Sequence, residues 1–155
     1  MSIKTENLYN KKPIEVAIIG YGTIGRVHGK ILNKLGAKIV GVTCSTPDTV
    51  DKASTDIYHS FGNKPFTSTN SDYLIKRCKP DCVFICTPPE QHLDNIINAL
   101  KYEIPIFCEK PLIWNKKFTK DDFNKHLEFI KSSKNRKLFC NFANNNLLKL
   151  LIKKA

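Results

Sequence analysis

Residues 16–29 read VAIIGYGTIGRVHG, an apolar run that ends in three spaced glycines and continues as a helix-like pattern. Gly20 would make the tight turn out of a strand, Gly22 would let the backbone approach a pyrophosphate, and Gly25 would let a helix pack closely on a sheet. The backbone N–H groups that begin such a helix face the phosphates. The stretch therefore predicts a dinucleotide site, and glycines that serve only a turn are the alternative. The expected contacts in this loop are Gly20, Gly22, Thr23, Ile24 and Gly25.

The rest of the chain alternates short apolar segments with amphipathic ones, as parallel α/β proteins do. We expect strands, two of them with the loops that follow, at residues 14–20, 37–44, 64–68, 81–89, 104–112 and 137–142. We expect helices at residues 23–36, 46–62, 71–80, 90–103 and 116–137. Right-handed crossovers then give an α/β fold, a doubly wound parallel sheet with helices on both sides.

Length and composition favour one domain that folds around its own core, since the chain has 155 residues of which 41% are hydrophobic. No apolar run approaches the roughly 18 residues that a membrane span requires. The polar segment 1–13 offers no apolar stretch for a secretory signal, so the expected compartment is cytoplasmic.

Charge and cysteine spacing point away from two other classes of protein. The net charge of +11 comes from scattered lysines without a basic motif interleaved with aromatics, so we expect a solvated surface that favours anionic ligands rather than nucleic acid. The six cysteines contain no C-x-x-C pair, so no metal site is expected. The cysteines inside apolar runs, expected as buried thiols, are Cys82, Cys86, Cys108 and Cys140.

Three motifs in order resemble the Gfo/Idh/MocA oxidoreductase family, which includes glucose-fructose oxidoreductase and inositol dehydrogenase. They are GYGTIGRVHG (20–29, with the family's histidine at His28), VFICTPPEQHLDNIINAL (83–100) and IPIFCEKPL (104–112). The resemblance implies a Rossmann domain of a sugar or polyol dehydrogenase over residues 14–142. It leaves a polar segment at 1–13 and a short tail at 143–155, for which we expect a helix.

Both later motifs follow strands, so their turns open onto the crevice where such sheets bind ligands. The resemblance places Lys110 near the nicotinamide, where an ammonium group can orient a substrate hydroxyl and assist its proton. His92 is a second catalytic candidate, and a polar surface residue is the alternative. Pro111 matches a proline that is cis in the family, and Glu109 could serve as a structural partner. The residues expected on the nicotinamide side are Thr87, Pro88, Pro89, Glu109 and Lys110.

The second strand lacks the acid that binds the ribose 2′-hydroxyl in NAD enzymes. Cys44 occupies its place, and the nearest acid, Asp48, suits a helix cap instead. Ser45 and Thr46 could donate to a 2′-phosphate, although no arginine stands beside them in the sequence. The pattern favours NADP over NAD, with Cys44, Ser45 and Thr46 as contacts.

The family's second domain, which supplies much of the sugar site and a D-x-x-x-H pair, has no counterpart in these residues. Asp122 and His126 have that spacing, but they fall in the amphipathic segment 116–137, so we interpret them as a helix-surface pair. We therefore expect an NAD(P)-dependent oxidoreductase-like protein that is incomplete as a catalyst. The alternative is a non-catalytic nucleotide-binding module or sensor. The leucines of residues 147–151 predict self-association or a partner protein.

Overall fold

The computed structural model describes residues 12–132 and 138–140. Its strands are β1 (Glu15–Ile19), β2 (Lys38–Thr43), β3 (Phe66–Ser68), β4 (Cys82–Ile85), β5 (Ile106–Cys108) and β6 (Leu138–Cys140). They form one sheet in the order β3-β2-β1-β4-β5-β6, and every neighbouring pair is parallel. This order confirms the doubly wound α/β fold that the sequence predicts.

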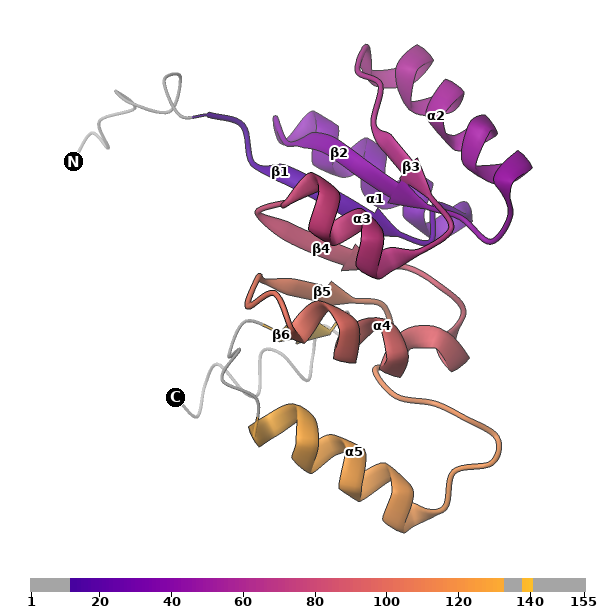
Figure 1. Cartoon of the computed structure of the whole chain (residues 1–155), viewed down its shortest axis with the longest axis vertical. Helices are drawn as coiled ribbons and strands as arrows, with labels where there is room; N and C mark the ends of the chain where they lie inside the picture. Colours follow the sequence, from indigo (N-terminus) through magenta and orange to yellow (C-terminus); the bar gives the residue numbers. More distant parts are fainter. Residues whose placement is uncertain (1–11, 133–137, 141–155) are drawn as a thin grey trace, which may run out of the picture.

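The helices are α1 (Thr23–Lys34), α2 (Pro47–Phe61), α3 (Ser71–Cys78), α4 (His92–Leu100) and α5 (Lys120–Ser132), with a 3-10 turn, η1 (Pro89–Gln91), before α4. Two apolar clusters lie on opposite faces of the sheet. Residues of α2 join Val16 and Ile18 in one cluster, and residues of α3, α4 and α5 join Ala17 and Ile19 in the other. Figure 1 shows α3 and α4 in front of the sheet and α1 behind it.

The central strands carry the core because β-branched residues fill both of their faces. Val16, Ala17 and Ile18 are fully buried, and so are Val83 and Ile85 of the adjacent strand. Each buried valine or isoleucine side chain contributes roughly 1.5–3 kcal/mol on burial. None of the helices in the described part of the chain combines the length and hydrophobicity of a membrane span.

Helix α1 differs from its sequence pattern, because most of its large apolar residues stay in contact with solvent. Ile24, Val27 and Ile31 are each 48% exposed, and Leu35 beyond the helix end is 78% exposed. The buried residues of α1 are Gly25 and Gly29. The helix therefore approaches the sheet with its backbone, and its apolar stripe faces outward.

Helix α2 begins at a different cap from the one that the sequence suggested. The hydroxyl of Thr46 accepts from the backbone N–H of Thr49, and the Thr49 side chain accepts from the backbone N–H of Thr46. Asp48 lies in the first turn but is not the cap. Thr46 is the cap because its short hydroxyl reaches the free N–H groups of the first turn from the position directly before Pro47. The helix ends at Gly62, whose φ of 75° suits glycine.

Helix α5 carries the D-x-x-x-H spacing at the surface. Asp122 accepts from the backbone N–H and the hydroxyl of Thr119, which lowers the pKa of its carboxyl. His126 stacks on Phe118 instead. These contacts confirm a structural interpretation of the two residues. The expected segments 1–13 and 143–155 fall almost entirely outside the described residues.

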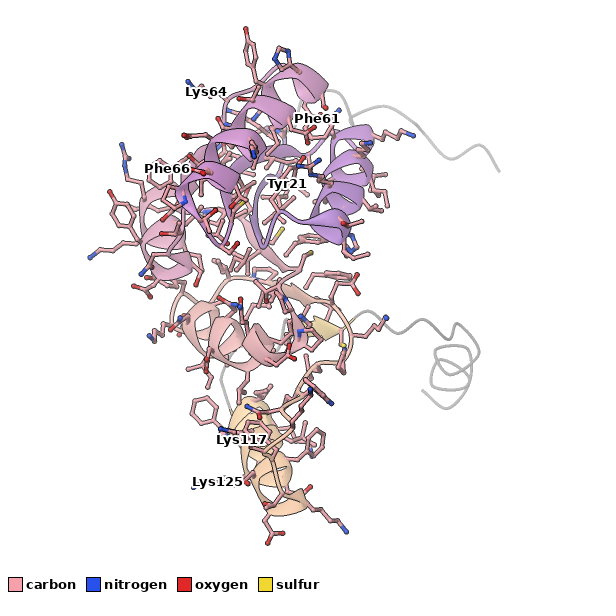
Figure 2. The ribbon with its side chains drawn as sticks, turned by 90° about the vertical axis from the view of Figure 1, so that its right-hand side faces the viewer. Tyr21, Phe61, Lys64, Phe66, Lys117 and Lys125 are labelled. Atoms are coloured by element: carbon pink, nitrogen blue, oxygen red, sulfur yellow. The ribbon has the colours of Figure 1, made fainter. Side chains whose placement is uncertain are left out.

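The basic side chains are spread over the molecule. Figure 2 shows Lys64 at one end of the protein and Lys117 and Lys125 at the other end. These three lysines therefore do not form one patch.

The packing of α1 gives a prediction about stability. A Cβ at Gly25 would overlap the carbonyl oxygen of Gly20, whereas a Cβ at Gly22 would meet nothing within 4 Å. We expect Gly25→Ala to lower the free energy of unfolding by about 3 kcal/mol, because backbone cannot yield as a flexible side chain can. Gly22→Ala is the matched control and should change stability by less than about 0.5 kcal/mol. Urea unfolding followed by circular dichroism measures both, and equal stability of the two variants would contradict the packing.

Candidate functional site

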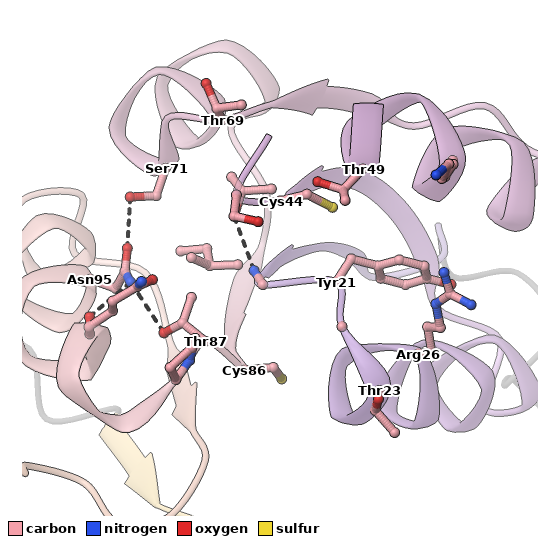
Figure 3. Close-up of a pocket in the computed structure, with 18 of the residues that line it drawn as sticks. Tyr21, Thr23, Arg26, Cys44, Thr49, Thr69, Ser71, Cys86, Thr87 and Asn95 are labelled. Atoms are coloured by element: carbon pink, nitrogen blue, oxygen red, sulfur yellow. Dashed lines mark hydrogen bonds between the residues drawn. The ribbon is translucent and has the colours of Figure 1, made fainter. Parts of the chain in front are cut away.

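The carboxyl ends of β1, β2 and β4 meet at one edge of the sheet and open into a cavity of about 930 Å³. Parallel strands place their ends on the same side, which is why loops far apart in sequence share this space. Figure 3 shows the cavity from close by. Its lining residues are Ile19, Gly20, Tyr21, Gly22, Thr23, Arg26, Val27, Lys30, Thr43, Cys44, Ser45, Thr49, Lys52, Thr69, Ser71, Cys86, Thr87, Pro88, Gln91 and Asn95.

The glycine loop after β1 lies between the carboxyl ends of β2 and β4. Gly20 has a φ of 91°, and its N–H donates to the Thr43 hydroxyl at 3.0 Å. A Cβ at Gly20 would lie 2.7 Å from the Thr87 nitrogen, so only glycine fits between the first and fourth strands. The loop is therefore fixed from both sides before the helix begins.

The N-terminus of α1 faces the cavity, and no side chain of the helix caps its backbone N–H groups. Its N-cap, Gly22, makes no side-chain cap bond, and no acidic residue lies in the first turn. The free N–H groups of a helix start carry partial positive charge and bind anions. Because a Cβ at Gly22 would also meet nothing within 4 Å, this space suits a phosphate group.

The far side of the loop carries positive charge that the sequence did not reveal. The Arg26 guanidinium lies 5.9 Å from the centre of the Tyr21 ring, and the Tyr21 hydroxyl donates to Asp56 at 3.1 Å. Figure 3 shows Arg26 and Tyr21 on the opposite side of the cavity from Asn95. An arginine thus shares the cavity with Cys44, although none stands beside Ser45 and Thr46 in the sequence. Arg26 lies one helical turn beyond Gly22, so the fold brings it into the same cavity as Cys44.

The charges of the cavity favour an anion. The described residues that line it include Arg26, Lys30 and Lys52, but no aspartate or glutamate. Burial raises the pKa of the Cys44 thiol, so the group in the place of the expected acid is neutral at neutral pH. Among its described lining residues, the site therefore combines a helix start and three cations with no carboxylate.

A polar network supports the turn after β4. The Asn95 amide donates to the Gln91 carbonyl at 2.9 Å and to the Thr87 hydroxyl at 3.4 Å, and it accepts from the Ser71 hydroxyl at 2.9 Å. Figure 3 shows these bonds as dashed lines. The network joins α3, α4 and the Thr87 turn. Ser71 and Asn95 escaped sequence analysis because polar residues on amphipathic helices usually face solvent.

The turn after β5 holds the expected catalytic lysine. Lys110 is exposed, and the Lys110–Pro111 peptide is cis. Glu109 is 8% exposed, and its Oε1 lies 2.6 Å from Nε2 of His28. Glu109 is thus a structural partner, and it joins this turn to α1.

His92 is buried, which contradicts the alternative of a polar surface residue. The residue is 1% exposed, so it is not a surface group. Its Nδ1 lies 2.7 Å from the Pro111 carbonyl oxygen and its Nε2 lies 2.8 Å from the Thr87 carbonyl oxygen. Both ring nitrogens contact backbone carbonyl oxygens, and His92 is not among the residues that line the cavity.

The cavity brings together part of the expected cofactor set. The predicted residues that line it are Gly20, Gly22, Thr23, Cys44, Ser45, Thr87 and Pro88. The predicted residues outside its lining are Ile24, Gly25, Thr46, Pro89, Glu109 and Lys110. Gly25 packs on the loop, and the Thr46 hydroxyl is engaged by the cap of α2.

The cysteines are less deeply buried than the sequence indicated. Cys108 is buried, whereas Cys82, Cys86 and Cys140 are half-buried. Cys82 and Cys86 lie on the face of the sheet that carries the Val16 and Ile18 cluster. They pack against the edge of that cluster and are only partly buried. Cys86 also lines the cavity, and burial raises the pKa of its thiol to about 12.

Comparisons with known proteins show the family to which the chain belongs. Residues 14–142 match the model of the Gfo/Idh/MocA family, described as an oxidoreductase family with an NAD-binding Rossmann fold. The chain is 29% identical over 101 residues to inositol 2-dehydrogenase 1 of Paenarthrobacter aurescens, covering 65% of this chain and 29% of the relative. It is 31% identical over 100 residues to inositol 2-dehydrogenase of Rhizobium meliloti, covering 64% and 28%. The chain thus spans less than a third of these relatives.

Solved structures show the same fold. Scyllo-inositol dehydrogenase from Lactobacillus casei with bound NAD(H) and scyllo-inositol superposes with a TM-score of 0.69 at 23% identity, covering 92% of this chain and 42% of that one. Myo-inositol dehydrogenase from the same organism, in complex with NAD(H) and myo-inositol, gives a TM-score of 0.71 at 21% identity and the same coverage. Because the family model covers most of the sequence, the chain belongs to the Gfo/Idh/MocA oxidoreductase family, and its fold is the family's NAD-binding Rossmann fold.

Proposed function

We propose that the chain binds a nicotinamide dinucleotide in the cavity at the carboxyl edge of the sheet, as the cofactor-binding part of an oxidoreductase that acts on sugar or polyol CH–OH groups. The observation that carries this proposal is the free N-terminus of α1, which opens into a space with three cations and no carboxylate among the described lining residues. The inositol dehydrogenase relatives support the substrate class.

Each part of such a cofactor has a matching surface. The N–H groups after Gly22 would hold the pyrophosphate, and the residues at the end of β2, with Tyr21 and Arg26, would hold the adenosine half. Thr87 and Pro88 would border the nicotinamide half. The cofactor supplies the hydride donor or acceptor when bound. Lys110 would orient the substrate hydroxyl and carry its proton.

We propose NADP(H) as the preferred cofactor over NAD(H). Cys44 brings no negative charge to the place where NAD enzymes have an acid, because burial keeps its thiol protonated. Ser45 offers a hydroxyl, and Arg26 and Lys52 line the same cavity. A guanidinium and an ammonium group both stabilise a phosphate.

A second candidate function is a nucleotide-binding module or sensor without turnover. Lys110 alone supplies only part of a catalytic site, because hydride transfer needs a substrate held at close range and a proton acceptor. Hydride transfer between NADPH or NADP and a panel of sugars and inositols separates the two. Turnover supports the oxidoreductase, and binding without turnover supports the module.

We also propose that the chain associates with a second copy of itself through the outward stripe of α1. Ile24, Val27, Ile31 and Leu35 follow helical spacing and are all exposed. Single exposed apolar residues are common on protein surfaces, but a continuous row of four is typical of an interface. The leucines of residues 147–151, predicted as a contact, lie outside the described residues.

The first prediction about function concerns dinucleotide binding. Gly22→Val places a branched side chain in the space before α1, while the extended φ and ψ of Gly22, −87° and −155°, accept valine. We expect binding to weaken by about 3 kcal/mol, roughly 100-fold in Kd, with little change in thermal stability. Isothermal titration of NADPH and NADH against both proteins measures this. If the wild type binds neither nucleotide at millimolar concentration, the loop is only a turn.

The second prediction concerns cofactor choice. Cys44→Asp puts a carboxylate against the 2′-phosphate and should weaken NADPH binding by about tenfold. NADH binding should hold or strengthen, because the carboxylate can accept from the ribose hydroxyl. Ser60→Asp is the control, since it adds the same charge on an exposed part of α2 outside the cavity lining. Tighter binding of NADH than NADPH by the wild type would contradict the proposal.

The third prediction tests self-association. Ile31→Lys introduces a charge into the α1 stripe and should weaken a dimer by about 2 kcal/mol. Phe129→Lys is the matched control, because Phe129 is similarly exposed, at 52% against 48%, but lies on α5. Light scattering over a range of concentrations gives the mass of each protein. A monomeric wild type would rule out this interface.

A further inference from the structure

We propose that His28 and His92 are positioning residues that hold the Glu109–Pro111 turn from opposite faces of the sheet and thereby fix Lys110. This inference rests on the proposed function for its consequence but not for its geometry. His28 comes from α1 and His92 begins α4, and these helices cover different faces. Both side chains end on the same three-residue turn.

His28 reaches the turn through a carboxylate. Its Nε2 lies 2.6 Å from Oε1 of Glu109, and the other carboxylate oxygen accepts from the Lys110 backbone N–H at 3.2 Å. The buried Glu109 carboxylate thus links His28 of α1 to the backbone nitrogen of Lys110. A bond of this kind, sheltered from water, is stronger than an exposed one.

Two aromatic rings hold His28 in place. Its ring centre lies 5.6 Å from that of Phe84 and 5.1 Å from that of Phe107, and these two phenylalanines stack at 4.6 Å. The imidazole therefore has a packed rotamer, and the side chains of His28 and Glu109 are only 16% and 11% exposed. A flexible surface pair would not have this support.

His92 holds the opposite end of the turn. Its Nδ1 contacts the Pro111 carbonyl and its Nε2 contacts the Thr87 carbonyl, so one ring spans the turns after β4 and β5. Carbonyl oxygens only accept hydrogen bonds. The protonated imidazole satisfies both contacts, and the neutral ring satisfies one.

The arrangement couples the cavity to the lysine. The helix that carries His28 begins at the proposed pyrophosphate site, and the Thr87 that His92 contacts lines the cavity. Lys110 itself is exposed and lies two residues beyond the three-residue strand β5, so its backbone position depends on its neighbours. A catalytic group on a loop is precise only when such contacts fix the loop.

Hydrogen exchange in the free protein tests the geometry without any nucleotide. We expect His28→Ala and His92→Phe to speed exchange of residues 109–114 by about tenfold, while Ser71–Cys78 of α3 exchanges as in the wild type. His28→Gln should restore slow exchange, because its amide can donate to Glu109. His59→Ala, an exposed histidine on α2, is the control. Unchanged exchange at the turn, or equal acceleration in α3, would overturn the proposal.

Binding measurements test the consequence. His28→Ala and His92→Phe should weaken NADPH binding by about tenfold and leave 2′-phospho-ADP-ribose, which lacks the nicotinamide, within about twofold. Equal loss of both ligands would show that the histidines support the fold as a whole and would contradict positioning. If the wild type binds neither ligand, the proposed function fails, and the exchange experiment still decides whether the histidines fix the turn.

Discussion

The close approach of α1 to the first strand is the constraint on which the rest of the structure depends. Gly25 packs against the carbonyl of Gly20, and Gly20 in turn leaves no room for a side chain beside Thr87. These two contacts set the distance between the helix, the first strand and the fourth strand. A free helix start, a cavity and a link to the β5 turn all follow from that distance.

Electrostatics then determine what the cavity accepts. The N-terminus of α1, Arg26 and Lys52 contribute positive charge, while the thiol of Cys44 stays neutral because burial raises its pKa. On the other side, Asn95 and His92 both contact Thr87, which lines the cavity. Hydrogen bonds thus support the loops at both ends of the cavity, where a long ligand such as a dinucleotide would be held.

Sequence alone predicted the elements, the parallel sheet and the glycine loop, because apolar periodicity and glycine spacing are local signals. It did not predict Arg26 beside Cys44 or the bond between His28 and Glu109, which join segments far apart in sequence. The outward stripe of α1 was missed because helical spacing shows that a face is apolar, not that it is buried. Thr46, not Asp48, caps α2, because a capping side chain must stand directly before the first helical residue to reach the free backbone N–H groups.

The central claim is that a dinucleotide lies along the carboxyl edge with its phosphates at the start of α1. A two-dimensional amide NMR titration with NADPH tests this residue by residue. We predict that the amides of Gly22, Thr23 and Ser45 shift with added NADPH, and that those of α5 do not. Amides that stay unshifted at millimolar NADPH, or shifts confined to α5, would contradict the account.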